Sequence, residues 1–363
     1  MTRYRVQWNA AAETQEDTAC EASPSGAGPA VEPACSVNPD LAISVVVPTY
    51  RRPELLMRCL GCLLLQTFDA SRYEIIVCDD GPDDDTRKAV HELARLHAEA
   101  GPLIRYLAIT ATQGPAAARN AGWRIASAPL VAFTDDDTEP AAQWLSEGIA
   151  AFDGSAGAVV GHIDVPLPPR PTDYELDASG LARAEFATAN VFVERAALIR
   201  TRGFDERFTS AWREDSDLQF ALLAAGIPIG RAERAVVRHP VRPARWGVSL
   251  SQQRKSQFDA LLFKKYPTQF CSHISAHAPH FYYAVLLAAM SALIAAFAGH
   301  FTLAACATLI WAALTLTFCF RRLAGTSRTV IHVLEMLWTS MWIPFLSIYW
   351  RCYGALKFRV WFP

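Results

Sequence analysis

The sequence predicts an α/β domain built on a mainly parallel sheet, followed by a C-terminal helical membrane anchor. From residue 42 onward, short apolar runs alternate with amphipathic runs, as in a chain of strand and helix units. Four such units in succession favour parallel strands with helices on both faces of the sheet. Nearly all of the charge lies before Lys265, whereas residues 281–320 contain no Asp, Glu, Lys or Arg.

Composition excludes some partners and compartments. The chain has 363 residues, of which 52% are hydrophobic and 19% are charged, a composition rich in apolar residues for a soluble protein. A formal net charge of -2 provides no basic surface, so we expect no nucleic-acid partner. Nine cysteines without a repeating spacing do not resemble a secreted disulfide framework, which favours a reducing compartment.

Two local features have a structural interpretation. Residues 1–41 are rich in Ala, Pro, Ser and Gly and lack the basic and apolar regions of a signal peptide, so we expect a disordered tail. Cys59 and Cys62 form a CxxC inside an apolar helical run, where residues three apart share one face. No second Cys or His pair stands nearby, which favours packing over redox or zinc chemistry.

Strands and helices alternate regularly up to residue 152. Each predicted strand is a short apolar run, and each helix follows at amphipathic spacing; Pro53 opens the first. Strands are predicted at 42–50, 73–80, 103–110 and 130–137, and helices at 53–66, 84–100, 114–128 and 141–152.

The pattern loosens after residue 152. A strand is predicted at 158–167, and four prolines within residues 166–187 indicate a long loop of the kind that covers active sites. Order returns at 187–204, before a helix at 212–226 that Gly226 ends and a strand at 234–240. We expect residues 42–245 to form one domain.

Polar side chains follow three of the predicted strands. In open parallel sheets, ligands bind beyond the carboxyl ends of the strands, so these side chains predict a site. They are Thr49, Tyr50 and Arg51 after the first strand, Asp79 and Asp80 after the second, and Asp135, Asp136 and Asp137 after the fourth.

The uncharged run predicts two membrane spans, at about 281–299 and 301–320. As one helix it would extend about 60 Å, twice the thickness of the hydrocarbon core, so it must fold back at Gly299 and His300. The turn has no Lys or Arg, whereas residues 321–328 contain three Arg, which places the large domain in the cytoplasm, on the inner face of the cell membrane. The alternative is a helical hairpin buried in a soluble core.

The flanking segments predict further contact with lipid. Residues 329–349 are apolar but contain His332, Glu335 and Pro344, and we favour an interfacial or re-entrant segment over a third span. Residues 246–279 mix aromatic and aliphatic residues with Arg and Lys, as an amphipathic helix on an anionic leaflet would.

The three adjacent aspartates predict a divalent cation site. Carboxylates two residues apart at the end of a strand can turn to the same side, and Mg²⁺ or Mn²⁺ held by one or two carboxylates keeps positions open for substrate phosphates. Taken alone, the DxD pattern of Asp135 and Asp137 also suits phosphatases, calcium loops or a solvated acidic loop.

Seven sequence blocks follow one another between residue 43 and about residue 240. They are "SVVVPTYRRPELLMRCLGCLLLQT", "YEIIVCDDGPDDDT", "GPAAARNAGW", "LVAFTDDDTEP", "TANVFVERAAL", "GFDERF" and "REDSDLQFALLAAG". In this order they resemble the family 2 glycosyltransferases of GT-A fold. The resemblance implies a Rossmann-like nucleotide half, an acceptor half and inverting transfer of a sugar from a nucleotide-diphosphate sugar.

The resemblance also implies residue roles. Asp215 corresponds to the general base with Glu214 beside it, although both acids could simply stabilise a helix N-terminus. Asp135 lies near the ribose, either Asp136 or Asp137 binds the metal, and His239 is a further metal candidate. The positions implied for the nucleotide are Pro48, Thr49, Tyr50, Asp79, Asp80 and Arg119.

The expected function is transfer of one sugar to a lipid-linked or saccharide acceptor at the cytoplasmic membrane face. The sequence has no QxxRW block, and two or three spans are too few for an export channel, so single transfer is favoured over polymerisation. The alternatives are nucleotidyl or phosphoryl transfer, for which a GxxxxGK loop is missing, and an inactive partner protein of the same fold.

Overall fold

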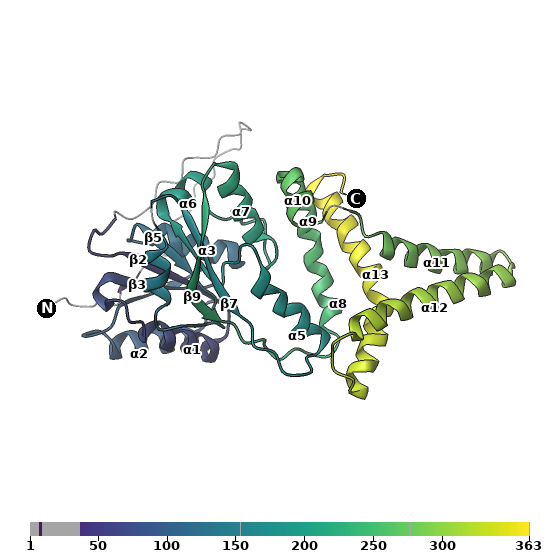
Figure 1. The fold of residues 1–363 in the computed structure, drawn as a ribbon, viewed down its shortest axis with the longest axis horizontal. Coiled ribbons are helices and arrows are strands. Elements are labelled where there is room, and N and C mark those ends of the chain that lie inside the picture. The colour runs from purple at the N-terminus through teal and green to yellow at the C-terminus, as the bar shows by residue number, and fades with distance from the viewer. Residues whose placement is uncertain (1–6, 9–36, 153, 276, 363) are drawn as a thin grey trace, which may run out of the picture. The chain divides into compact units, whose positions relative to one another are not determined.

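The computed structural model describes residues 7–8, 37–152, 154–275 and 277–362 (Figure 1). The chain divides into two compact units. The catalytic unit comprises residues 1–165 and 182–240, and the anchor unit comprises residues 166–181 and 241–363. Most of the predicted tail lies outside the described residues, but Gln7–Trp8 forms a short strand, β1, beside β4.

The catalytic unit is built on one mixed sheet of nine strands in the described residues. Their order is β1-β4-β3-β2-β5-β8-β7-β9-β6. The strands are β2 (Ile43–Thr49), β3 (Tyr73–Asp79), β4 (Leu103–Ala108), β5 (Leu130–Phe133), β6 (Glu139–Pro140), β7 (Ala158–Asp164), β8 (Val191–Glu194) and β9 (Ile229–Arg238).

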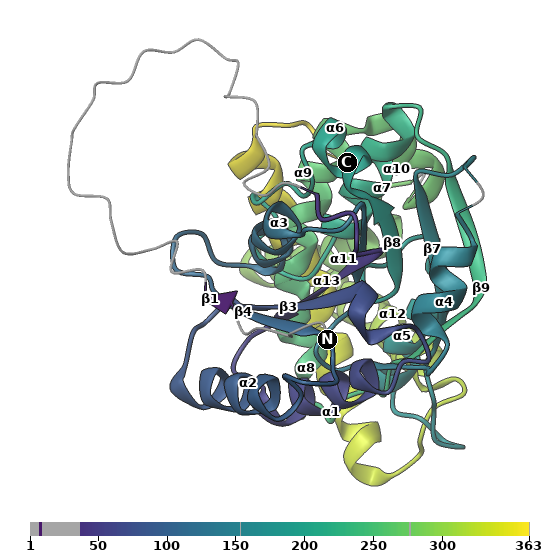
Figure 2. The ribbon, with the colours of Figure 1, turned by 90° about the vertical axis from the view of Figure 1, so that its left-hand side faces the viewer.

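Helices cover both faces of this sheet (Figure 2). In β2, Val45 and Val47 pack into one apolar core and Val46 into the other, because successive side chains of a strand point to opposite faces. One core includes α1 (Pro53–Leu64), α2 (Asp84–Leu96) and α4 (Trp144–Ala150), and the other α3 (Pro115–Ile125), α6 (Arg195–Thr201) and α7 (Glu214–Ala224).

The sequence predicts the first half of the sheet better than the second. Strands β4, β3, β2 and β5 are parallel neighbours, as four strand and helix units require. Strand β8 is antiparallel to both β5 and β7, and the mixed pattern is not visible in apolar runs alone.

The predicted loop 166–187 contains helical structure. It contains α5 (Asp173–Ala178) and a 3-10 turn at Ser179–Arg183. A capping box starts α5: the Thr172 hydroxyl accepts from the Glu175 N–H, and the Glu175 carboxylate accepts from the Thr172 N–H. Residues 166–181 belong to the anchor unit, whereas the predicted domain 42–245 includes them.

The anchor unit contains only helices and connecting turns among its described residues. The predicted amphipathic segment forms α8 (Val248–Gln252), a 3-10 turn (Gln253–Ser256), α9 (Gln257–Lys265) and α10 (Pro267–His273). Three further helices, α11 (His280–Phe297), α12 (Phe301–Leu323) and α13 (Val330–Phe358), are each long and apolar enough to cross a membrane. Gly299, at φ 78°, turns the chain between α11 and α12 where the sequence predicts the break.

Candidate active site

The carboxyl ends of the parallel strands place the predicted polar residues together. Thr49 at the end of β2 lies opposite Asp79 at the end of β3 in the sheet register. The Asp135–Asp137 loop follows β5, the neighbour of β2 on its other side. The Thr49 hydroxyl donates to the Asp136 carboxylate at 2.7 Å and so joins the two strand ends directly.

Two of the three aspartates meet a histidine. Ligand atoms of Asp135, Asp137 and His239 all lie within 4.8 Å of one another. His239 Nε2 is 3.4 Å from a carboxylate oxygen of Asp137, and the His239 backbone N–H donates to the Asp164 carbonyl. The two carboxylates suit Mn²⁺ or Mg²⁺, with positions left for phosphate oxygens, whereas the imidazole is a softer donor than Mg²⁺ prefers.

Asp136 has a different role from its neighbours. Its carboxylate accepts from the Thr49 hydroxyl and from the Arg52 guanidinium at 3.3 Å, and it lies outside the group of Asp135, Asp137 and His239. Burial raises the pKa of Asp136 to about 6, although Thr49 and Arg52 act in the opposite direction. The geometry therefore favours Asp137 over Asp136 as the metal ligand.

Arg119 on α3 connects the aspartate loop to α7. Its guanidinium is 2.8 Å from a carboxylate oxygen of Asp135 and 3.2 Å from one of Glu214, and the residue is 3% exposed. This burial between two carboxylates is not that of a surface arginine, and the nucleotide contact implied by the resemblance stays a prediction. Arg119 draws the acids that follow β5 and begin α7 toward one place.

Asp215 does not act as a helix cap. Helix α7 begins after Arg213, whose backbone is left-handed at φ 74°, and no side-chain hydrogen bond caps it. The Asp215 carboxylate instead accepts from the Thr188 hydroxyl at 2.6 Å. Burial raises the pKa of Asp215 despite the nearby Arg119 and the Thr188 hydrogen bond. A carboxylate with a raised pKa is a better proton acceptor near neutral pH.

Glu214 is almost completely buried beside Asp215. Desolvation, followed by the charge of Asp215, raises the pKa of the Glu214 carboxyl, and Arg119 only partly offsets this. Its Oε2 atom has no hydrogen-bond partner within the described part of the chain. Its contact with Arg119 suggests that Glu214 positions the site rather than contacting substrate.

The predicted nucleotide residues are also brought together, but two of them have internal partners. Asp79 accepts from the Tyr106 hydroxyl at 2.8 Å, and both Asp80 oxygens accept from the Gly114 N–H. Tyr50 is 47% exposed and lies directly over Gly81, where a Cβ would come within 2.4 Å of its ring. Pro48 is paired within the sheet opposite Cys78. Tyr50 is thus partly exposed, with the Arg51 guanidinium over its ring at 5.4 Å from the ring centre.

Two functional side chains were missed by the sequence analysis. Thr188 and Arg52 orient Asp215 and Asp136 from distant positions in the chain. Neither has a charge or spacing pattern that distinguishes it from surrounding residues. The packing interpretation of Cys59 is supported: the residue is fully buried in an apolar core, and burial raises the pKa of its thiol far above the usual range.

The fold and this acidic edge define a class of protein: an α/β enzyme domain with a cluster at the carboxyl ends of its strands that could hold a divalent cation. Residues 44–208 match the family model "Glycosyl transferase family 2". A structure of the mannosyltransferase PcManGT from Pyrobaculum calidifontis, in complex with GDP-Man and Mn²⁺, superposes with a TM-score of 0.52 and 20% identity over 89% of each chain, which supports the GT-A fold. The matched part of the chain, residues 44–208, belongs to the family 2 glycosyltransferases.

Two curated relatives are glycosyltransferases with different acceptors in their names. The validoxylamine A glucosyltransferase of Streptomyces hygroscopicus subsp. jinggangensis is 31% identical over 58% of this chain and 56% of its own length. The GalNAc(5)-diNAcBac-PP-undecaprenol beta-1,3-glucosyltransferase of Campylobacter jejuni is 29% identical over 46% of this chain and 55% of its own length. The chain thus spans little more than half of either relative.

Proposed function

We propose that this chain is a metal-dependent, inverting glycosyltransferase that transfers one sugar from a nucleotide-diphosphate sugar to a lipid-linked acceptor at the cytoplasmic membrane face. The observation that carries the proposal is the position of Arg119 between Asp135 and Glu214. Arg119 joins the aspartate loop, which suits a metal-bound diphosphate, to helix α7, which carries the candidate base. Transfer requires the donor and the acceptor to be held close together in one site.

The acceptor side of the reaction needs one proton acceptor. The acceptor oxygen attacks the anomeric carbon, the bond from that carbon to the diphosphate oxygen breaks, and the acceptor proton passes to Asp215. The Thr188 hydroxyl holds the Asp215 carboxylate in one orientation, and Glu214 with Arg119 fixes the start of α7. The products are the glycosylated acceptor and a nucleoside diphosphate.

The nucleotide-sugar donor is assigned to the part of the site that contains the aspartate loop and the end of β2. Asp135, Asp137 and His239 would hold a divalent cation, which neutralises the charge of the leaving diphosphate. Tyr50 can stack on the nucleoside base, and Thr49 keeps the aspartate loop against β2 through Asp136. The proposal names neither the nucleotide base nor the sugar of the donor.

The lipid-linked acceptor is favoured by the anchor. The exposed apolar surfaces of α11 and α12 would hold the enzyme at a bilayer, and the Campylobacter relative is named for an undecaprenol-linked acceptor. Arg321 and Arg322 lie in the last turn of α12 and Arg328 follows it, which supports a cytoplasmic position for the catalytic unit. The Streptomyces relative is named for validoxylamine A and for no lipid carrier, so a saccharide acceptor stays the second candidate.

Purified full-length protein can test the proposal with a panel of nucleotide sugars. Thermal shift with Mn²⁺ identifies the donor, because a ligand that binds only the folded state raises the unfolding temperature. Transfer of radiolabelled sugar should stop with EDTA and return with Mn²⁺ or Mg²⁺, and label should enter the organic phase with undecaprenyl acceptors. Undiminished transfer in EDTA would exclude the metal role, and label only in water-soluble product would exclude the lipid acceptor.

A further inference from the structure

Helix α13 has two different faces. Its buried residues include His332, Met336, Thr339, Ile343 and Ser347, which recur at helical spacing. The exposed apolar and aromatic residues lie on the opposite side: Val330, Ile331, Leu334, Leu337, Trp338, Trp342, Tyr349, Tyr353 and Leu356. Lys357, near the end of the helix, is also exposed. A helix that crosses a bilayer among lipids is apolar all round, whereas this one is polar where it meets protein.

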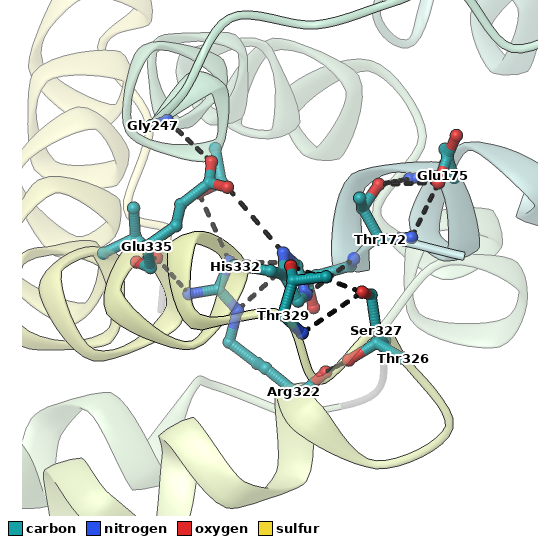
Figure 3. A network of polar contacts seen from close by, with 12 residues as sticks. Thr172, Glu175, Gly247, Arg322, Thr326, Ser327, Thr329, His332 and Glu335 are labelled. Carbon is teal, nitrogen blue, oxygen red and sulfur yellow. Dashed lines mark hydrogen bonds and ion pairs between the residues drawn. The ribbon is translucent and has the colours of Figure 1, made fainter. Parts of the chain in front are cut away.

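The first turns of α13 pack against a polar network (Figure 3). His332 Nε2 accepts from the Asp173 N–H, and Glu335 accepts from the Gly247 N–H at 2.6 Å. Arg322 donates to the Asp173 carboxylate at 2.6 Å and to the hydroxyls of Thr339 and Ser340. Hydrocarbon cannot replace these partners, so this part of the helix stays at the level of water and headgroups.

A cavity with charged residues in its lining lies beside the same turns. It has a volume of about 360 Å³ and includes Arg242, Arg245 and Trp246 together with His332 and Glu335 in its lining. Arginines around an open cavity are compatible with water or lipid headgroups and not with acyl chains.

The segment from α8 to α9 runs beside α13 along most of its length. Arg254 lies over the Trp350 ring at 5.9 Å, and Lys264 donates to the Phe358 carbonyl at 2.8 Å. At Gly354 the approach is so close that a Cβ would lie 2.3 Å from the Gln257 carbonyl oxygen. If α13 crossed the bilayer, this segment would have to cross with it, carrying Arg254, Lys255, Asp259, Lys264 and Lys265.

The exposed face has the composition of a bilayer interface. Trp and Tyr concentrate where acyl chains meet headgroups, because their rings are apolar and their N–H and O–H groups are polar. Trp338, Trp342, Tyr349 and Tyr353 occupy the middle and C-terminal part of this face, whereas in a spanning helix such residues gather at its two ends. Helix α12 ends at Leu323, just after Arg321 and Arg322, where the hairpin would leave the hydrocarbon. Only six residues separate this end from Val330, the first residue of the apolar face of α13.

We propose that α13 lies in the plane of the bilayer interface, with its aromatic face against lipid and its polar face against α8 and α9. The chain then crosses the membrane twice, through α11 and α12, and its C-terminus is on the same side as its N-terminus. The proposal depends on membrane insertion of the hairpin and not on the sugar-transfer reaction.

Reporters on the full chain test the number of crossings. A fluorescent protein or alkaline phosphatase is fused after Pro363, fused at the N-terminus, or inserted at Gly299–His300 in bacterial cells. We expect both terminal reporters on one side and the inserted reporter on the other. A C-terminal reporter on the side opposite the N-terminal one would overturn the proposal.

Depth measurements separate an in-plane helix from a re-entrant one. An encoded fluorescent amino acid replaces Trp338, Trp342 or Leu356, with Leu309 in α12 as the deep control, in phosphatidylglycerol and phosphatidylethanolamine vesicles. Headgroup-attached nitroxide should quench the three α13 positions to a similar extent and at least twofold more than Leu309, with the order reversed for nitroxide at the chain end. If the two nitroxides placed the label at position 342 at the same depth as the label at position 309, the in-plane helix would be contradicted. If neither nitroxide quenched any α13 position, protein and not lipid would cover this face, which would also contradict the proposal.

Discussion

The two units each contain a buried arginine, but the charges around the two arginines differ. In the catalytic unit, Arg119 pairs with Asp135 and Glu214, and Asp215 lies close enough to influence it. In the anchor unit, Arg322 pairs with Asp173, and hydroxyls of Ser249, Thr339 and Ser340 accept its other hydrogen bonds. The first cluster has more carboxylates than cations, whereas the second is balanced.

This difference indicates what each cluster is for. Surplus carboxylates in a partly buried site raise one another's pKa values and favour binding of a cation or of protons. A balanced cluster with hydroxyl partners satisfies itself and mainly fixes structure. We therefore expect changes around Arg119 to alter both chemistry and stability, and changes around Arg322 to alter stability alone.

The largest expected effect is that of Asp215→Asn. The amide cannot take the acceptor proton, so kcat should fall by about 10²- to 10⁴-fold while nucleoside diphosphate binding is kept. Single-turnover transfer and calorimetric titration measure the two quantities. Asp84→Asn, an exposed acid on α2, is the matched control. Normal turnover by Asp215→Asn would leave α7 with a structural role only.

Some features of the site can be predicted from the sequence, and others depend on contacts between distant residues. The site at the strand ends could be predicted, because each carboxylate follows a recognisable apolar run, and the seven blocks fixed their order. The choice between Asp136 and Asp137 could not, because it depends on hydrogen bonds from Thr49 and Arg52, which are about 85 residues away in sequence. The antiparallel β8 and the membership of α5 in the anchor unit also depend on long-range packing.

Loss of Arg119 should have the next largest effect. Arg119→Gln leaves Asp135 and Glu214 buried without their cation, which costs about 3–5 kcal/mol of folding free energy and roughly 10²-fold in transfer. Adding Glu214→Gln removes one of the unpaired charges, so the double variant should recover part of the stability. Thermal unfolding of the single and double variants gives the coupling. A double variant less stable than Arg119→Gln alone would show that repulsion is not the cause.

Thr188→Val should produce a smaller, pH-dependent effect. The Thr188 hydrogen bond lowers the pKa of Asp215, so removing it raises that pKa further. Because the base acts when ionised, activity is lost as pH falls through this pKa, and the acid limb of the kcat/KM profile should move to higher pH. Transfer at neutral pH should fall on the order of tenfold and recover at alkaline pH. Thr201→Val on α6 is the control, and an unshifted limb would contradict the role of Thr188.

The smallest effect on chemistry should come from the balanced cluster. Arg322→Gln removes the ion pair with Asp173 and weakens the contacts with Thr339 and Ser340. These contacts hold α12, α13 and α5 together. Because the cluster is partly exposed, we expect a loss of about 1–3 kcal/mol in stability, seen as a lower unfolding temperature in detergent. Arg328→Gln, on the same connection, controls for the change in net charge. Donor hydrolysis should stay within twofold of the parent, because no carboxylate of the catalytic unit loses a partner; a tenfold loss would show that Arg322 also supports the chemistry.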